Sequence, residues 1–213
     1  MRSESSPGSQ KKRSFIEEAR RAQIVSAAIT TIAETGYPGA SLSRIAQRAG
    51  ISKGVISYHF AGKDELMEQV VERVYTEIAE FVLPRVAEAP DERAALRSLI
   101  LAVADYMRGH RERLVALGGI FNGMQTPEGN RRYGFAANEP IYRSTEEMLR
   151  AGQDRGLFRA FDVRVIAVTL QAAIDGMFGY WATYPDHDLE AHAAELAEFI
   201  DRSVRADPSD SPG

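Results

Sequence analysis

The 213-residue chain contains no cysteine. This absence excludes disulfide bonds and thiolate chemistry, and it is consistent with a reducing cytoplasm. The sequence also lacks any run of about 18 apolar residues, the length that a membrane-spanning helix needs. No apolar segment follows the basic residues near the N-terminus, as one would in a secretory signal. We therefore expect a cytoplasmic protein without a membrane partner.

Patterns that carry catalysis or hold metals are also missing. The four histidines lie in unrelated segments, with no His-Glu-x-x-His motif and no pair at i and i+4, so the sequence predicts no zinc site. No glycine-rich phosphate loop follows a strand, and no segment alternates apolar and polar residues as strands do. We expect an all-α protein that is not an enzyme and needs no cofactor. A helical small-molecule enzyme is the less favoured alternative.

Lysine is absent after residue 63, and charge is divided unevenly along the chain. Residues 1–63 have a balance of +6, whereas residues 64–213 have one of −10. A basic segment binds phosphates by releasing counterions, and an acidic one is repelled by a duplex. The N-terminal part is therefore expected to contact nucleic acid. A chance division of solvated charge is the alternative.

Residues 41–60, SLSRIAQRAGISKGVISYHF, have the pattern of two short helices joined by a tight turn. Gly50 gives the backbone the freedom that a sharp turn needs. Ser52 is a suitable N-cap for the second helix, in which Val55 and Ile56 point inward. The outward residues are small, polar or basic, as suits a helix in the major groove of DNA. The pattern predicts a DNA-binding helix-turn-helix, with a protein-docking module as the alternative.

The positions of proline, glycine and clusters of polar residues predict four segments. Residues 1–14 are expected to be a disordered basic arm, and residues 15–62 a three-helix DNA-binding domain. A long helix then leads into a helical domain for ligand binding and dimerisation over residues 63–206, followed by a disordered tail at 207–213. Apart from the two short helices, the predicted helices are 15–35, 63 to about 84, 91–108, 111–124, 134–155, 162–183 and 188–205.

The order of helix, helix-turn-helix and long helix resembles the TetR family of transcriptional regulators. Three parts of residues 24–71 carry the resemblance: the Ala-Gly-Ile-Ser-Lys-Gly turn, the Tyr-His-Phe triplet at 58–60 and the helix start Lys-Asp-Glu-Leu at 63–66. The resemblance implies a homodimer that represses by binding a palindromic operator in double-stranded DNA and is released by a small molecule. A regulator that responds to no ligand is the alternative.

Eight residues are candidate DNA contacts. They are Ser41, Arg44, Lys53, Gly54, Ser57, Tyr58, His59 and Lys63. Lys53 suits a guanine edge or a phosphate, Gly54 permits close approach of the backbone, and Ser57 can bind a base edge. Tyr58 and His59 resemble the pair that grips phosphates in the family. The remaining three are expected to bind phosphates, which set register more than sequence preference.

The candidate effector site combines aromatic residues and methionines with a few amides and one carboxylate. Its residues are Tyr106, Met107, Phe121, Asn122, Met124, Gln125, Tyr142, Gln171, Asp175 and Phe178. An apolar cavity with a few convergent polar groups is the usual small-molecule site, so the effector is expected to be hydrophobic or aromatic. Asp175 would need a partner in such surroundings: a cationic ligand, an arginine or a helix cap. Core packing is the alternative role for each of these residues.

The last two predicted helices carry apolar stripes that suit a dimer interface. The stripes are Ile166, Leu170, Ile174, Met177 and Trp181 in 162–183, and Leu189, Leu196, Phe199 and Ile200 in 188–205. Pairing with the same helices of a second copy would form a four-helix isologous interface. Burial of the same stripes inside one chain is the alternative.

Overall fold

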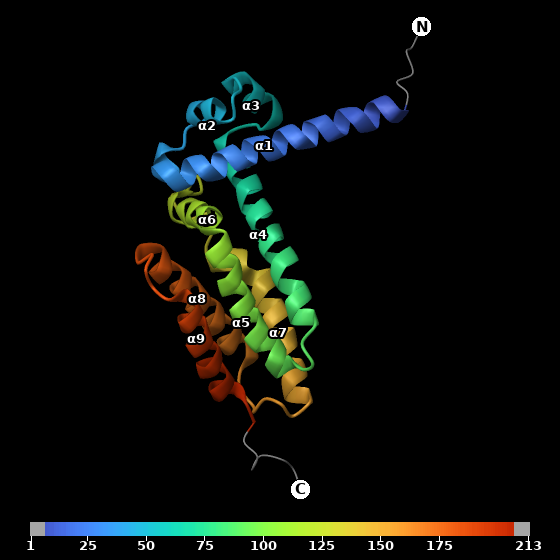
Figure 1. Cartoon of the computed structure of the whole chain (residues 1–213), viewed down its shortest axis with the longest axis vertical. Coiled ribbons are helices and arrows are strands. Elements are labelled where there is room, and N and C mark those ends of the chain that lie inside the picture. The colour runs from blue at the N-terminus through green and yellow to red at the C-terminus, as the bar shows by residue number, and fades with distance from the viewer. Residues whose placement is uncertain (1–6, 207–213) are drawn as a thin grey trace. The chain divides into compact units, whose positions relative to one another are not determined.

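The computed structural model of the chain describes residues 7–206, with side chains from Phe15 onward. This part of the chain is helical and contains no β-strand, which confirms the expected all-α fold (Figure 1). The helices are α1 (Pro7–Gly39), α2 (Leu42–Arg48), α3 (Lys53–His59), α4 (Lys63–Ala87), α5 (Glu92–Gly109), α6 (Arg111–Gly123), the 3-10 helix η1 (Phe135–Asn138), α7 (Glu139–Asp154), α8 (Val163–Thr183) and α9 (Leu189–Val204).

Helix α1 begins earlier than the sequence predicts. Residues 7–14 are helical, although a disordered arm was expected there. Residues 10–13 are good or acceptable helix formers, and no proline lies between Pro7, where the helix begins, and Pro38, which favours extension of the helix. At the other end, Gly36 has φ 70° and ψ 163°, a non-helical conformation that ends the regular part of α1 as expected. Residues 1–6 and the predicted tail 207–213 lie outside the described range.

The chain divides into two compact units. Over the described residues, the head unit comprises 7–74 and 112–132, and the body unit comprises 75–111 and 133–206. The expected boundary at residues 62 and 63 therefore differs from the observed one, because the head unit also includes the start of α4 and most of α6. The reason is packing: Leu66, Met67 and Val70 of α4 are completely buried and contribute to the core of this unit.

The core of the head unit holds α1, α2 and α3 together. The apolar stripe of α1, Ile24, Ala28 and Ile32, is buried, as are Ile45 of α2 and Ile56 of α3. Helix α6 approaches the end of α1 closely, because two glycines face it. A Cβ on Gly119 would lie 3.2 Å from Ile32, and one on Gly123 would lie 2.3 Å from the Tyr37 ring. The glycines therefore mark close packing of α6 on α1.

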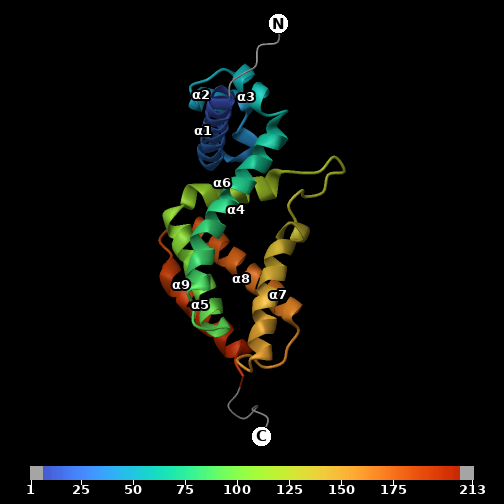
Figure 2. The same cartoon turned by 90° about the vertical axis from the view of Figure 1, so that its right-hand side faces the viewer.

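The body unit is a layered bundle in which α5 packs against α9 and α7 against α8 (Figure 2). Most of the residues predicted for the dimer interface belong instead to the core of this unit. Six of the nine stripe residues are buried inside the chain: Leu170, Ile174, Met177, Trp181, Leu189 and Ile200. The buried side chains of α8 and α9 form the core of the bundle, where these two helices pack against α5 and against each other. Of the nine, Phe199 is the one that is highly exposed, at 67%.

A different face of α8 remains uncovered. By length and composition alone, α8 is the one helix in residues 7–206 apolar enough to cross a membrane, yet only 28% of its apolar window is buried within this chain. Its outer surface carries Val165, Tyr180 and a run of small residues between them, including Ala172 and Gly176. An apolar helix with this much exposed surface is typical of one that has a partner.

Candidate nucleic-acid interface

The turn between α2 and α3 has the geometry that the sequence predicts. Gly50 has φ +66°, and the Ile51 N–H donates to the Ala46 carbonyl at 3.0 Å, which closes the turn. The Ser52 hydroxyl accepts from the Val55 N–H at 3.3 Å and caps α3. Ile56 is completely buried and Val55 is half-buried, whereas Lys53, Ser57 and Tyr58 face outward.

The outer surface of α3 presents the predicted base and phosphate contacts. Lys53, Gly54, Ser57 and Tyr58 are exposed, and Tyr58 reaches 73%. His59 is half-buried, and its ring meets the Tyr58 ring edge-on with centroids 5.0 Å apart. A Cβ on Gly54 would meet nothing closer than the Ser52 hydroxyl at 3.6 Å, so this part of the helix surface is open to a partner.

The three predicted phosphate contacts outside α3 also have roles within the head unit. Ser41 is exposed and caps α2 by accepting from the Arg44 N–H at 3.3 Å. The Arg44 guanidinium is exposed and donates to the Gly39 carbonyl at 3.1 Å. Lys63 is half-buried: its Nζ donates to the Tyr37 carbonyl at 2.9 Å and lies 4.1 Å from the Tyr37 ring centre. Burial lowers the pKa of Lys63, while Asp64 opposes that shift.

Two residues of α1 that the sequence analysis missed position the helix-turn-helix. The Arg21 guanidinium donates to the His59 carbonyl at the end of α3 and lies 4.3 Å from the Phe60 ring centre. The Gln23 amide donates to the Ala49 carbonyl at the end of α2, at 2.8 Å. Both bind carbonyls that helix ends leave without intrahelical donors. The adjacent basic pair at 20 and 21 was the available sequence signal.

The ten candidate effector residues are divided between the two units. Phe121, Asn122, Met124 and Gln125 belong to the head unit, and the other six belong to the body unit. Several have partners that suit packing. The Asn122 amide donates to the Gly118 carbonyl at 2.9 Å. The buried Tyr106 ring stacks on His110 with centroids 4.1 Å apart, and Met124, Met107 and Tyr142 are buried too.

Asp175 is the most chemically distinctive member of this set. Its carboxylate accepts from the Gln171 amide at 2.8 Å, on the flank of α8. Asp175 is exposed as a residue, but the surrounding protein partly desolvates its carboxylate. This desolvation raises the pKa of Asp175. Tyr75 of α4 belongs to the same neighbourhood and was missed by the sequence analysis. Burial, and then the charge of Asp175, raise its pKa.

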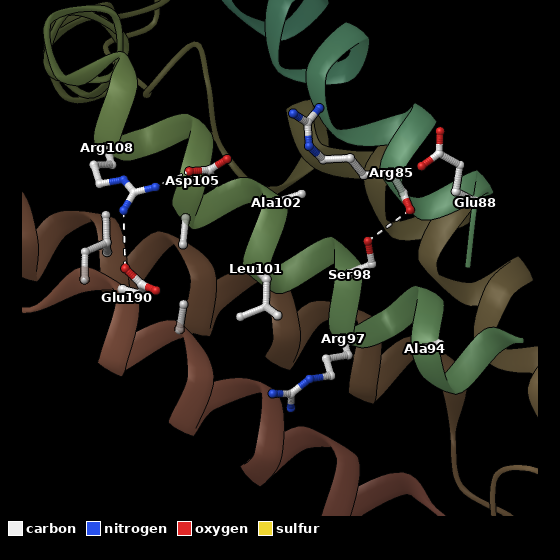
Figure 3. A pocket seen from close by; sticks show the side chains of 13 residues that line it. Arg85, Glu88, Ala94, Arg97, Ser98, Leu101, Ala102, Asp105, Arg108 and Glu190 are labelled. Atoms are coloured by element: carbon white, nitrogen blue, oxygen red, sulfur yellow. Dashed lines mark hydrogen bonds and ion pairs between the residues drawn. The ribbon is translucent and has the colours of Figure 1, made fainter. Parts of the chain in front are cut away.

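The body unit also has a groove that contains none of the ten candidate effector residues. It has a volume of about 640 Å³ and lies between the end of α4, the outer face of α5 and the start of α9 (Figure 3). Leu101 and several alanines supply its apolar surface. The charges at its rim partly neutralise one another, because Arg108 forms ion pairs with Asp105 and, at 3.3 Å, with Glu190. The groove was not foreseen because its walls come from three separate helices.

A compact head with an exposed, capped second helix, set on a glycine turn, defines a helix-turn-helix protein. Comparison with known proteins supports this description. Residues 24–70 match the family model described as bacterial regulatory proteins, tetR family. This part of the chain is therefore similar to the DNA-binding domain of that family.

Curated relatives align with less than half of the chain. The transcriptional regulator BetI of Burkholderia ambifaria is 40% identical over 91 residues, which is 42% of this chain and 47% of BetI. BetI of Burkholderia cenocepacia is 38% identical over the same length. The chain therefore spans about half the length of the curated relatives it matches.

Solved structures share the fold over most of the chain. NalD of Pseudomonas aeruginosa, the secondary repressor of a multidrug efflux pump, has a TM-score of 0.70 at 22% identity, over 89% of this chain and 99% of NalD. The fatty acid degradation regulator FadR of Bacillus halodurans has a TM-score of 0.73 at 18% identity, over 93% and 96%. At these identities the likeness establishes the fold of the body unit and not its ligand.

Proposed function

We propose that this chain is a transcriptional regulator that binds a palindromic operator as a homodimer. The exposed surface of α3 carries the proposal: Lys53, Ser57 and Tyr58 project from this helix. Arg21 binds the end of α3, and Gln23 binds the end of α2. The basic charge balance of residues 1–63 supports contact with phosphates. Repression and cytoplasmic location are part of the same proposal, as is the absence of enzymatic activity.

The DNA-binding proposal is tested by selecting genome fragments with the purified chain and then titrating the recovered operator at two salt concentrations. Tyr58→Ala should weaken binding to all sequences alike and leave the salt slope nearly unchanged, because it removes a phosphate contact that carries no charge. Lys53→Ala should cost about 1–3 kcal/mol and relax the preference at one or two base pairs. Recovery of no enriched sequence by folded protein would contradict the proposal.

Arg150→Ala is a matched control for these variants. Arg150 is exposed on α7, in the body unit, where it pairs with Glu146 at 3.5 Å. Its loss removes one positive charge, as Lys53→Ala does, but from outside the proposed interface. Operator affinity and its salt dependence should therefore remain those of the unmodified chain.

We also propose that the dimer forms through the exposed faces of α8 and α9. Support comes from Phe199, exposed at 67%, and from the apolar outer surface of α8. Phe199→Asp should shift the sedimentation of the chain from dimer to monomer. Phe135→Asp is the control, because Phe135 is exposed at 77% but lies on η1. Equal effects of the two substitutions, or none, would exclude this interface.

The third part of the proposal is release from DNA by a small hydrophobic or aromatic molecule, bound near Asp175, Gln171 and Tyr142. The desolvated carboxylate of Asp175 supports a binding role, since no cation is placed beside it among the residues described. A screen for compounds that raise the melting temperature, followed by operator titration, tests it. A compound that binds and leaves operator affinity unchanged would favour a regulator without ligand control.

A further inference from the structure

Two histidines meet at the turn between α8 and α9. The Nε2 atom of His187 lies 2.8 Å from the Nδ1 atom of His192, and the ring planes stand at 87°. Both residues are half-buried. Their spacing in the sequence predicts no metal site, because the two residues are five positions apart and one of them precedes α9. The turn, rather than a helical repeat, brings them together.

Backbone hydrogen bonds hold the two histidines in place. The His187 N–H donates to the Tyr184 carbonyl at 3.0 Å, and the His192 N–H donates to the Asp188 carbonyl at 3.1 Å. The Tyr180 ring meets the His187 ring edge-on, with centroids 4.8 Å apart. The two imidazoles are therefore held close before any ligand arrives, which reduces the entropy lost on chelation.

The separation of the two nitrogens suits one coordination geometry better than another. Two ligand atoms, each about 2.0 Å from a metal, lie about 2.8 Å apart at a right angle and about 3.3 Å apart at a tetrahedral angle. The observed 2.8 Å is a hydrogen-bond distance between the rings, and it is close to the separation required by the right angle of tetragonal Cu²⁺ and Ni²⁺ sites. Each ring must rotate until both lone pairs point to a common atom, and the ring that now donates must take its other tautomer.

We propose that His187 and His192 form a bidentate site for one Cu²⁺ or Ni²⁺ ion per chain. No group of three or more His, Asp or Glu residues that could hold a metal occurs in the described part of the chain, so the two imidazoles are its whole contribution. Water completes the coordination, and the half-buried position of the pair leaves room for it. The site is independent of the DNA-binding proposal, because both ligands belong to the body unit.

The test titrates the full-length chain, free of any polyhistidine tag, with copper, nickel and zinc chlorides. Calorimetry should give one Cu²⁺ per chain, and the electron paramagnetic resonance spectrum of the copper should show two imidazole nitrogens. Zn²⁺ should bind more weakly than Cu²⁺, in line with the Irving–Williams order and with the short nitrogen separation. Absence of stoichiometric binding would overturn the proposal.

Three variants assign the binding to this pair. His187→Gln and His192→Gln should each remove one nitrogen from the copper spectrum, and the double variant should lose the stoichiometric site. His110→Gln is the control, because it removes an imidazole of the same unit whose Nδ1 lies 2.9 Å from the Tyr106 carbonyl. Circular dichroism checks that each variant is folded. Unchanged copper binding by the folded double variant would mean an adventitious ion only.

Discussion

Replacement of Gly123 by alanine tests the packing of α6 on the head unit. A Cβ at this position would lie 2.3 Å from Cδ1 and 2.8 Å from Cγ of Tyr37, far inside the usual contact distance of about 3.5–4.0 Å. The ring would have to move by more than an ångström. It cannot move freely, because the Lys63 ammonium lies 4.1 Å from its centre.

Overpacking of this kind costs about 1–3 kcal/mol, and we expect Gly123→Ala to lower the free energy of unfolding by that amount. Gly119→Ala should cost less, because its Cβ would meet a single methyl group of Ile32 at 3.2 Å. Gly109→Ala is the control, since no atom lies within 4 Å of its Cβ position. Urea denaturation followed by circular dichroism measures all three.

A double-mutant cycle with Tyr37→Ala decides whether the ring is the cause. Once the ring is gone, Gly123→Ala should have no unfavourable effect, because alanine is intrinsically better than glycine in a helix by about 0.5–1 kcal/mol. If Gly123→Ala destabilised the chain equally with and without the Tyr37 ring, the steric argument would be refuted. A Gly109→Ala variant as unstable as Gly123→Ala would refute it as well.

Three further substitutions probe polar contacts, each by denaturation. Arg21→Ala should lower stability by about 1 kcal/mol through loss of its bond to the His59 carbonyl; Arg21→Lys should restore only part, and no loss would contradict the geometry. Hydrogen bonds from Arg164 and then Arg143 lower the pKa of Glu139 to about 2. The ionised carboxylate therefore stabilises the folded chain above pH 4.5, and this contribution disappears toward pH 2. Glu139→Gln should be less stable than the unmodified chain at pH 7 and equally stable at about pH 2. Desolvation raises the pKa of Asp175, so Asp175→Asn should be more stable at neutral pH, with the gain vanishing below the ordinary value of 3.8; lower stability at pH 7 would contradict this.

Local rules were sufficient for the helix-turn-helix. A glycine before an apolar residue and a serine cap fix the turn within a few residues, so Gly50, Ser52 and the outward set of α3 could be predicted from the sequence. The predicted ends of α5, α6, α8 and α9 are within one residue of the observed ones for the same reason: caps, proline and glycine act locally. Whether the exposed residues contact bases or phosphates stays a prediction.

Features that depend on distant segments were not predictable. The apolar stripe of α8 identifies the face that avoids water, but periodicity is the same whether that face meets α9 of its own chain or a second copy. Leu170 and Met177 are core residues, so the proposed dimer interface uses the opposite, exposed face of α8. Likewise, Arg21 is 38 residues from the carbonyl it binds, and no short-range pattern connects them.

Lys63 joins the proposed DNA surface to the packing of α6. The Lys63 ammonium group donates one hydrogen to the Tyr37 carbonyl, which leaves two for a phosphate. The ammonium lies over the Tyr37 ring, and Gly123 packs against that ring. A displaced ring should therefore displace the ammonium too. We expect the folded Gly123→Ala variant to bind operator DNA more weakly than the Gly109→Ala control, with a smaller salt slope, as fluorescence anisotropy at two salt concentrations can measure. Because Lys63 is a phosphate contact in this argument, the loss should be similar for all DNA sequences; a loss confined to particular bases would show that α3, and not Lys63, had moved.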